Sequence, residues 1–137
     1  KNGGNVIVQY NTGSPLLTKD LGPYPFAISR ERVTVENSPI QVDYSHPILA
    51  GPNKITARDF EGWVQERGLY FTANWDPNYS APIAFQDPGE EFFHGSLIHT
   101  KYGEGTYTYS SISWFRQLPA GVPGAVKLFV NFIEQGK

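Results

Sequence analysis

The sequence predicts a single α/β domain built around a mixed sheet, and three segments indicate it. Residues 5–10 form the short, nearly continuous apolar run of a buried strand. Residues 96–102 and 106–110 are rich in β-forming residues and are separated by Gly103-Glu-Gly105, a strong hairpin signal. A helix is expected from Pro123 to Ile133. Because this is the one convincing crossover helix, few strands can pair in parallel and the sheet should be mixed.

The first elements suggest a chain that continues a larger structure. Lys1-Asn-Gly-Gly4 is typical of a helix C-terminus, where glycine adopts the left-handed cap. We therefore interpret residues 1–4 as the end of a helix that begins before Lys1. The strand at 5–10 and a loop at 11–15 follow. On this interpretation the domain is incomplete here, and its sheet is completed by strands and helices that precede Lys1.

The middle of the chain predicts short elements separated by turns. Residues 32–36 alternate polar and apolar side chains, as a half-exposed strand does. Thr56 and Asp59 match a capping box, so a short helix is expected from about 57 to 62, stopped by Gly62. Residues 81–85 form a strand whose Pro82 suggests a sheet edge or a strand start.

The C-terminal third joins the hairpin to the closing helix. Trp114-Phe-Arg116 follows the second hairpin strand and is expected to be exposed in a loop. Pro123 suits a first helical turn. The spacing of the apolar residues predicts one buried stripe on the last helix. That stripe consists of Ala125, Leu128, Phe129, Phe132 and Ile133.

Composition excludes several classes of function. The 137 residues carry 11 basic and 13 acidic side chains, a net charge of −2, without a basic stripe, so a nucleic-acid partner is not expected. No apolar run approaches the roughly 20 residues of a membrane span. The absence of cysteine removes disulfides and thiolate chemistry.

No catalytic centre emerges from the residues. The histidines at 46, 94 and 99 lack zinc-site spacing, so we expect neither a metal nor a cofactor. The loop after the first strand, where an α/β fold would mount a nucleophile, carries Gln9-Tyr-Asn11, and neither Gln9 nor Asn11 is nucleophilic. The acidic pairs Glu61/Glu66 and Glu90/Glu91 are interpreted as solvated charges.

Aromatic residues give a stronger signal, at 15% of the chain. Trp63, Trp75 and Trp114 lie in or beside predicted loops, where indole faces next to polar groups suit sugar recognition. Large aromatic residues also fill cores and interdomain contacts, and that alternative stays open. Arg116 offers a fork for a carboxylate or phosphate, or a bridge to Glu61 or Glu66.

Several blocks together resemble a known family. They are Gly3–Asn11, the Asp43/His46-Pro47 turn, Ile55–Phe71 and Gly103–Ile133. The chain resembles, over nearly its whole length, the C-terminal extension of large bacterial PIG-L/LmbE-type proteins, the N-acetylglucosaminyl deacetylase family. That extension is similar to class I glutamine-amidotransferase-like domains, which implies a flavodoxin-like sheet.

The resemblance also indicates two catalytic features of related proteins that this chain lacks. Active amidotransferases carry a cysteine in the loop where this chain has Gln9, Tyr10 and Asn11, so amidotransferase activity is not expected. The family's zinc motif is of the His-Pro-Asp-Asp type and belongs to a separate N-terminal domain. The only His-Pro here, His46-Pro47, continues with Ile48-Leu49 and is not that motif.

The resulting hypothesis is a non-catalytic accessory domain that supports or presents a sugar substrate to the catalytic domain of the same parent protein. The expected ligand surface consists of Gln9, Asn11, Glu61, Trp63, Gln65, Arg67, Trp114 and Arg116. A free-standing carbohydrate-binding module is the first alternative. A glycan hydrolase is the second, and it requires Glu61, Glu66 or Glu91 to converge in one pocket. The resemblance implies an extracytoplasmic location.

Overall fold

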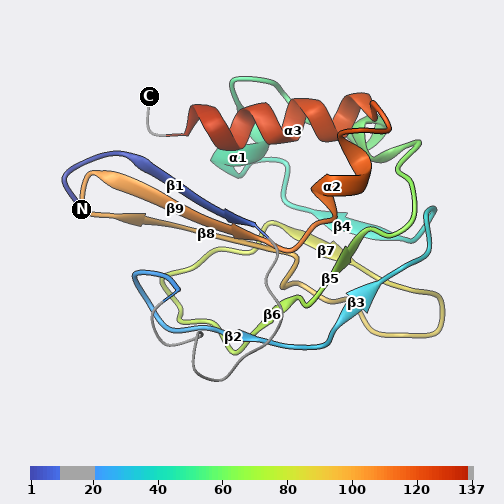
Figure 1. Cartoon of the computed structure of the whole chain (residues 1–137), viewed down its shortest axis with the longest axis horizontal. Coiled ribbons are helices and arrows are strands. Elements are labelled where there is room, and N and C mark those ends of the chain that lie inside the picture. Colours follow the sequence, from blue (N-terminus) through green and yellow to red (C-terminus); the bar gives the residue numbers. More distant parts are fainter. Residues whose placement is uncertain (10–20, 136–137) are drawn as a thin grey trace.

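The centre of the fold is a three-stranded mixed sheet in the order β1-β9-β8. We describe it from a computed structural model, which describes residues 1–9 and 21–135. β1 (Asn5–Gln9) runs parallel to β9 (Gly105–Ser110), and β9 pairs antiparallel with β8 (Leu97–Tyr102). The predicted first strand, the hairpin and the mixed α/β character are therefore confirmed. Figure 1 shows the helices along one side of this sheet and β2 and β6 on the other.

The remaining strands are short and form three antiparallel pairs. They are β2 (Ala27–Ile28) with β6 (Thr72–Ala73), β3 (Arg32–Val33) with β5 (Gly68–Leu69), and β4 (Ile40–Val42) with β7 (Ile83–Phe85). Single bridges tie neighbouring segments together: Gly68 to Ile112, Ser80 to His99, and Phe85 to Phe93. The strand expected at 32–36 is thus only two residues long.

The helical elements cover the sheet face toward which Ile7 and Leu97 point. They are α1 (Pro47–Ala50), the 3-10 turn η1 (Ala57–Phe60), α2 (Trp114–Gln117) and α3 (Pro123–Glu134). The predicted capping box at η1 is present, with the Thr56 amide donating to Asp59 Oδ2 at 2.8 Å. The turn ends at Phe60 rather than 62.

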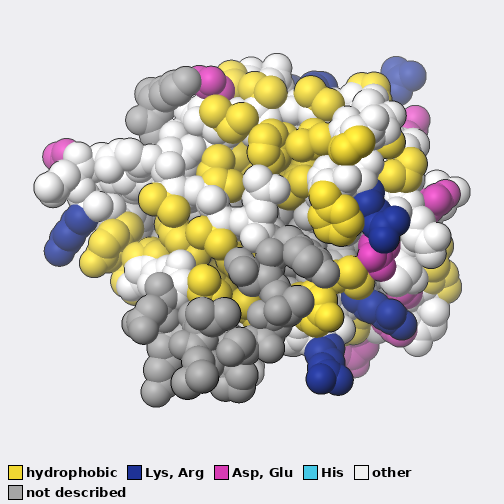
Figure 2. All heavy atoms as spheres, viewed as in Figure 1, with side chains coloured by type: hydrophobic (Ala, Val, Ile, Leu, Met, Phe, Trp, Pro, Cys, Tyr) yellow, Lys and Arg dark blue, Asp and Glu magenta, His cyan; other side chains and the backbone are white. Residues whose placement is uncertain are grey.

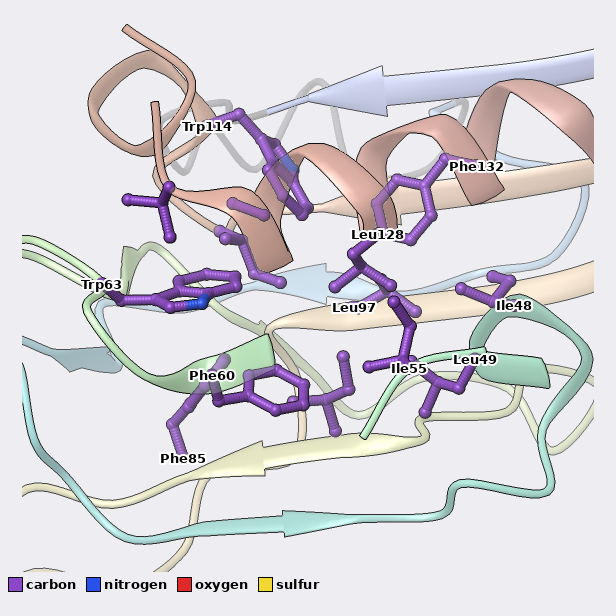
Figure 3. Close-up of a cluster of buried hydrophobic side chains, with 14 of the residues drawn as sticks. Ile48, Leu49, Ile55, Phe60, Trp63, Phe85, Leu97, Trp114, Leu128 and Phe132 are labelled. Carbon is purple, nitrogen blue, oxygen red and sulfur yellow. The ribbon is translucent and has the colours of Figure 1, made fainter. Parts of the chain in front are cut away.

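Two hydrophobic clusters occupy the two faces of the sheet. The first gathers side chains from α1, η1, α2 and α3 with Leu97, and Figure 3 shows Trp63 and Trp114 within it. The second contains Phe26, Ile98 and Tyr109. Because alternate strand residues face opposite sides, adjacent residues of β8 and β1 contribute to different clusters.

α3 is held against the domain by polar contacts as well as by its apolar face. Fully buried Asn131 donates from Nδ2 to the carbonyls of Ile48 and Asn53, both at 2.7 Å, and its Oδ1 accepts the Asn53 amide at 2.9 Å. At Gly124 a Cβ atom would lie 1.7 Å from the Asp59 carbonyl oxygen, so only glycine permits this approach to η1. Ile133 is 46% exposed, so its predicted place on the buried stripe is wrong.

The first four residues do not form a helical turn. The Lys1 and Gly4 carbonyls accept the amides of Glu104 and Thr106, each at 3.0 Å, so residues 1–4 run beside the β8–β9 turn. Gly3 and Gly4 have φ values of +97° and +99°, which glycine tolerates.

Candidate functional site

Two chain segments meet beyond the carboxyl ends of β1 and β9, the edge at which open α/β sheets bind ligands. Gln9 and Ser110 are register partners at these ends. The chain after Ser110 then pairs with the segment around β5: the Leu69 amide donates to the Ser111 carbonyl at 3.2 Å, and the Ser113 amide donates to the Arg67 carbonyl at 2.9 Å. Residues 67–69 and residues 111–113 thus lie side by side.

Glycine is required where these segments cross. A Cβ atom on Gly68 would lie 2.7 Å from the Ser111 carbonyl oxygen and 2.6 Å from the Phe71 ring. This close approach brings the start of α2 beside the chain that enters β5. Arg116 on α2 consequently forms an ion pair with Glu66, with Nη2 and Oε1 3.6 Å apart. The predicted alternative for Arg116, a bridge to Glu61 or Glu66, is confirmed for Glu66.

An open pocket lies at the outer side of this crossing. Its volume is about 530 Å³, within the range of small-molecule sites. The described residues that line it are Arg30, Arg32, Glu66, Leu69 and Tyr70. They come together because β3 pairs with β5, with Arg32 and Leu69 as register partners. In Figure 2, basic and acidic side chains gather at the right of the molecule, on the side where Figure 1 places α2, β3 and β5.

The pocket combines unpaired positive charge with a fixed aromatic residue. Arg30 and Arg32 are exposed, and within residues 1–9 and 21–135 neither side chain forms an ion pair or hydrogen bond. Glu66 is mostly buried and faces Arg116. Tyr70 has a φ of +56°, a left-handed conformation that is rare and costly for a bulky residue. These features together suit recognition of a polar, anionic ligand.

Both tryptophans of the expected ligand surface lie in the core. Trp63 and Trp114 are each 2% exposed, with ring centroids 6.0 Å apart. Their indole N–H groups are satisfied internally: Trp63 donates to the Asp59 carbonyl at 2.7 Å and Trp114 to Ser110 Oγ at 3.0 Å. Of the Trp-Phe-Arg segment expected to be exposed, only Phe115 and Arg116 are. The indoles therefore offer no face to a sugar.

Arg67 is also buried, at 3% exposure. Its guanidinium donates to the carbonyls of Glu36 and Phe60 and lies over the Trp63 and Phe85 rings, 5.6 and 5.4 Å from their centroids. Burial lowers the pKa of Arg67 to about 10, so it keeps its charge at neutral pH. Arg67 therefore stabilises the interior of this crossing and does not contact solvent.

The other expected surface residues are exposed but scattered. Gln9 lies at the end of β1, while Glu61 and Gln65 lie in the chain between η1 and β5, where the Gln65 amide donates to Glu36 Oε1 at 3.1 Å. Asn11 lies outside the described residues. Of the described members of the predicted set, only Arg116 is linked to the pocket, through its ion pair with Glu66. The sequence signal for the missed residues was the alternation of charge in Arg30-Glu31-Arg32.

A histidine–serine cluster on the helical side of the sheet has catalytic-looking spacing. His46 Nε2 lies 2.7 Å from Ser80 Oγ, and the His46 and His99 ring centroids are 5.5 Å apart. His46 Nδ1, however, accepts the Ile48 amide as the N-cap of α1, so Nε2 must carry the proton and donate it to Ser80. Ser80 Oγ in turn donates to the His99 carbonyl at 3.1 Å. A protonated Nε2 cannot act as a base, so this cluster is structural.

The carboxylates that a hydrolase would need are divided between pockets. Glu66 lines the pocket beside β5, whereas Glu91 lines a second pocket with Trp75 and His94, and Glu61 lines neither. Glycoside hydrolysis ordinarily requires two carboxyl groups flanking one bond. Within the described ranges, no group of three or more His, Asp or Glu side chains is placed to hold a metal ion.

No protein-family model, curated protein sequence or solved structure matches the chain. The family resemblance therefore stays a prediction. In the part of the chain that the structure describes, none of the helices combines the length and apolarity needed to cross a bilayer.

Proposed function

We propose that the chain is a non-catalytic, saccharide-binding accessory domain of a PIG-L/LmbE-type protein, with a class I amidotransferase-like, flavodoxin-like ancestry. In this role it presents a glycan to the catalytic domain of the same parent protein. The two blocks with the most specific resemblance, Phe60–Phe71 and Gly103–Ile133, support this proposal because they pair with each other at the carboxyl edge of the parallel strands.

One observation carries the proposal: the lining of the pocket at this edge suits binding rather than bond cleavage. The described residues of the lining provide two arginines, an aromatic ring, a leucine and a single carboxylate. That carboxylate, Glu66, is already engaged by Arg116. Among the described residues of the lining there is no Ser, Cys or His to serve as a nucleophile or base. Polar groups converging beside an aromatic side chain are the ordinary chemistry of ligand recognition.

The test is calorimetric titration of the chain with a panel of oligosaccharides, comparing Tyr70→Gly with wild type. Glycine suits the left-handed backbone at this position, so the variant removes the ring while relieving strain. We expect affinity to fall at least tenfold, about 1.4 kcal/mol. Tyr44→Ala is the matched control, because Tyr44 is exposed and does not line the pocket. Heats that stay flat across the whole panel would contradict the proposal.

An accessory domain and a free-standing carbohydrate-binding module differ in what the binding does. In a parent protein that carries the zinc domain, Tyr70→Gly should slow deacetylation of a polymeric glycan while leaving turnover of a short soluble substrate unchanged. A module that only anchors the protein would lose glycan retention with no change in either turnover rate.

A further inference from the structure

The pocket beside β5 has an unbalanced charge that restricts its ligand. Arg30 lies at a bend just before β3 and Arg32 lies in β3, and both residues line this pocket. Glu31, between them, points away: it lines the second pocket, and its amide donates to Ser29 Oγ at 3.1 Å. The acidic side chain between the two arginines is thus directed toward the second pocket.

The remaining acidic group in the pocket is already neutralised. Glu66 has its side chain only 16% exposed and pairs with Arg116. Arg30 and Arg32 therefore leave two positive charges facing one cavity of a chain whose net charge is −2. Guanidinium groups recognise planar or tetrahedral oxyanions through paired N–H donors. The same charges disfavour the ammonium group of a deacetylated amino sugar.

An apolar surface accompanies this charge. Leu69 and Tyr70 are half-buried and line the same pocket. Tyr70 is kept at a φ of +56° although glycine would remove the strain, so the aromatic ring is held at this place at an energetic cost. A ring fixed beside two arginines matches a ligand that joins an apolar sugar face to an anionic group.

We propose that this pocket binds an acidic saccharide, with Arg30 and Arg32 holding its carboxylate or sulfate group and Tyr70 contacting the sugar ring. This inference rests on the proposed function and adds the chemical class of the ligand. It also assigns to Arg30 and Arg32 a role that the sequence did not predict.

The experiment titrates the whole chain with four probes: an oligogalacturonate, an O-sulfated galactan oligosaccharide, a neutral galactan oligosaccharide and inorganic sulfate. Binding of either anionic saccharide at least tenfold tighter than both the neutral saccharide and sulfate supports the inference. Whichever of the two anionic saccharides binds more tightly identifies carboxylate or sulfate as the group that the pocket recognises.

The variant Arg30→Gln/Arg32→Gln should abolish this preference without changing the thermal midpoint, because both side chains are exposed and have no ion-pair partner among the described residues. Arg58→Gln, an exposed arginine on η1, should behave as wild type. Equal affinity for neutral and acidic saccharides, unaffected by the double substitution, overturns the inference and leaves the proposed function standing. Sulfate bound as tightly as the acidic saccharides overturns the saccharide requirement. A chain that binds no saccharide overturns both proposals.

Discussion

At the scale of single residues, His99 makes folding sensitive to pH. It is 6% exposed, its Nδ1 lies 2.8 Å from Thr108 Oγ1, and burial, with a smaller contribution from neighbouring His46, lowers its pKa from 6.5 to about 4. Unfolded His99 therefore takes up a proton at a higher pH than folded His99. Between about pH 6.5 and pH 4 the unfolded state binds more protons, so stability falls as the pH is lowered.

The expected loss from His99 between pH 7 and pH 4.5 is about 2–3 kcal/mol, since one pKa unit corresponds to about 1.4 kcal/mol. Urea unfolding of wild type and His99→Gln at both pH values measures it. Between pH 7 and pH 4.5, the free energy of unfolding of His99→Gln should fall by about 2–3 kcal/mol less than that of wild type. His94→Gln, with its side chain exposed, should keep the wild-type slope. Equal losses of unfolding free energy between the two pH values in His99→Gln and in wild type would show that His99 does not cause the loss of stability in acid.

Residue patterns predicted the polar contacts better than the exposure of the aromatic residues. One of the two alternatives for Arg116 was a bridge to Glu61 or Glu66, and the structure shows the bridge to Glu66. Trp63 and Trp114 were placed on a surface because they lie outside regular strands. Their burial depends on the pairing of residues 67–69 with 111–113, a long-range contact that local sequence does not encode.

At the scale of elements, α3 has one buried apolar face and one exposed apolar face, and the two differ in their contribution to stability. Ala125, Leu128 and Phe132 are fully buried against the first cluster. Val126 and Val130 are 43% and 36% exposed, and Figure 2 shows hydrophobic side chains gathered over this part of the molecule. The helical period predicted the buried face, but Ile133 shows that it could not fix the edge of that face.

Substitutions on the two faces should therefore differ in cost. Leu128→Ala removes buried methyl groups and leaves a cavity, and we expect the free energy of unfolding to fall by about 2–5 kcal/mol. Val126→Ala, on the exposed face of the same helix, should change it by less than about 0.5 kcal/mol. Chemical denaturation of the two variants tests the assignment. Similar losses for both would mean that the outer face of α3 is also covered.

The strands show the same division between local and long-range information. The β8–β9 hairpin was predicted because its pairing is closed by a glycine-containing turn a few residues long. The pairs β2–β6, β3–β5 and β4–β7 join segments tens of residues apart, and each strand has only two or three residues. Such strands carry too few residues for a period to be recognised. The pocket was missed for this reason, since the β3–β5 pair builds it.

At the scale of the whole molecule, both hydrophobic clusters depend on one small sheet. Leu97 of β8 belongs to the first cluster and its neighbour Ile98 to the second, while β1 contributes Ile7 to the first and Val8 to the second. Separating either cluster from the sheet would expose one face of the same three strands. We therefore expect the described part of the chain to unfold as a single cooperative unit.

Tryptophan fluorescence can follow the two clusters separately. Trp63 and Trp114 belong to the first cluster, and Trp75 packs against the second. In Trp75→Phe the signal reports the first cluster, and in Trp63→Phe/Trp114→Phe it reports the second. Within each variant, the fluorescence midpoint in urea should coincide with the midpoint from far-ultraviolet circular dichroism. Because β1 and β8 contribute side chains to both clusters, an earlier transition at Trp75 alone would require Ile98 and Tyr109 to lose their packing while β8 and β9 stay paired. That result would refute cooperative unfolding.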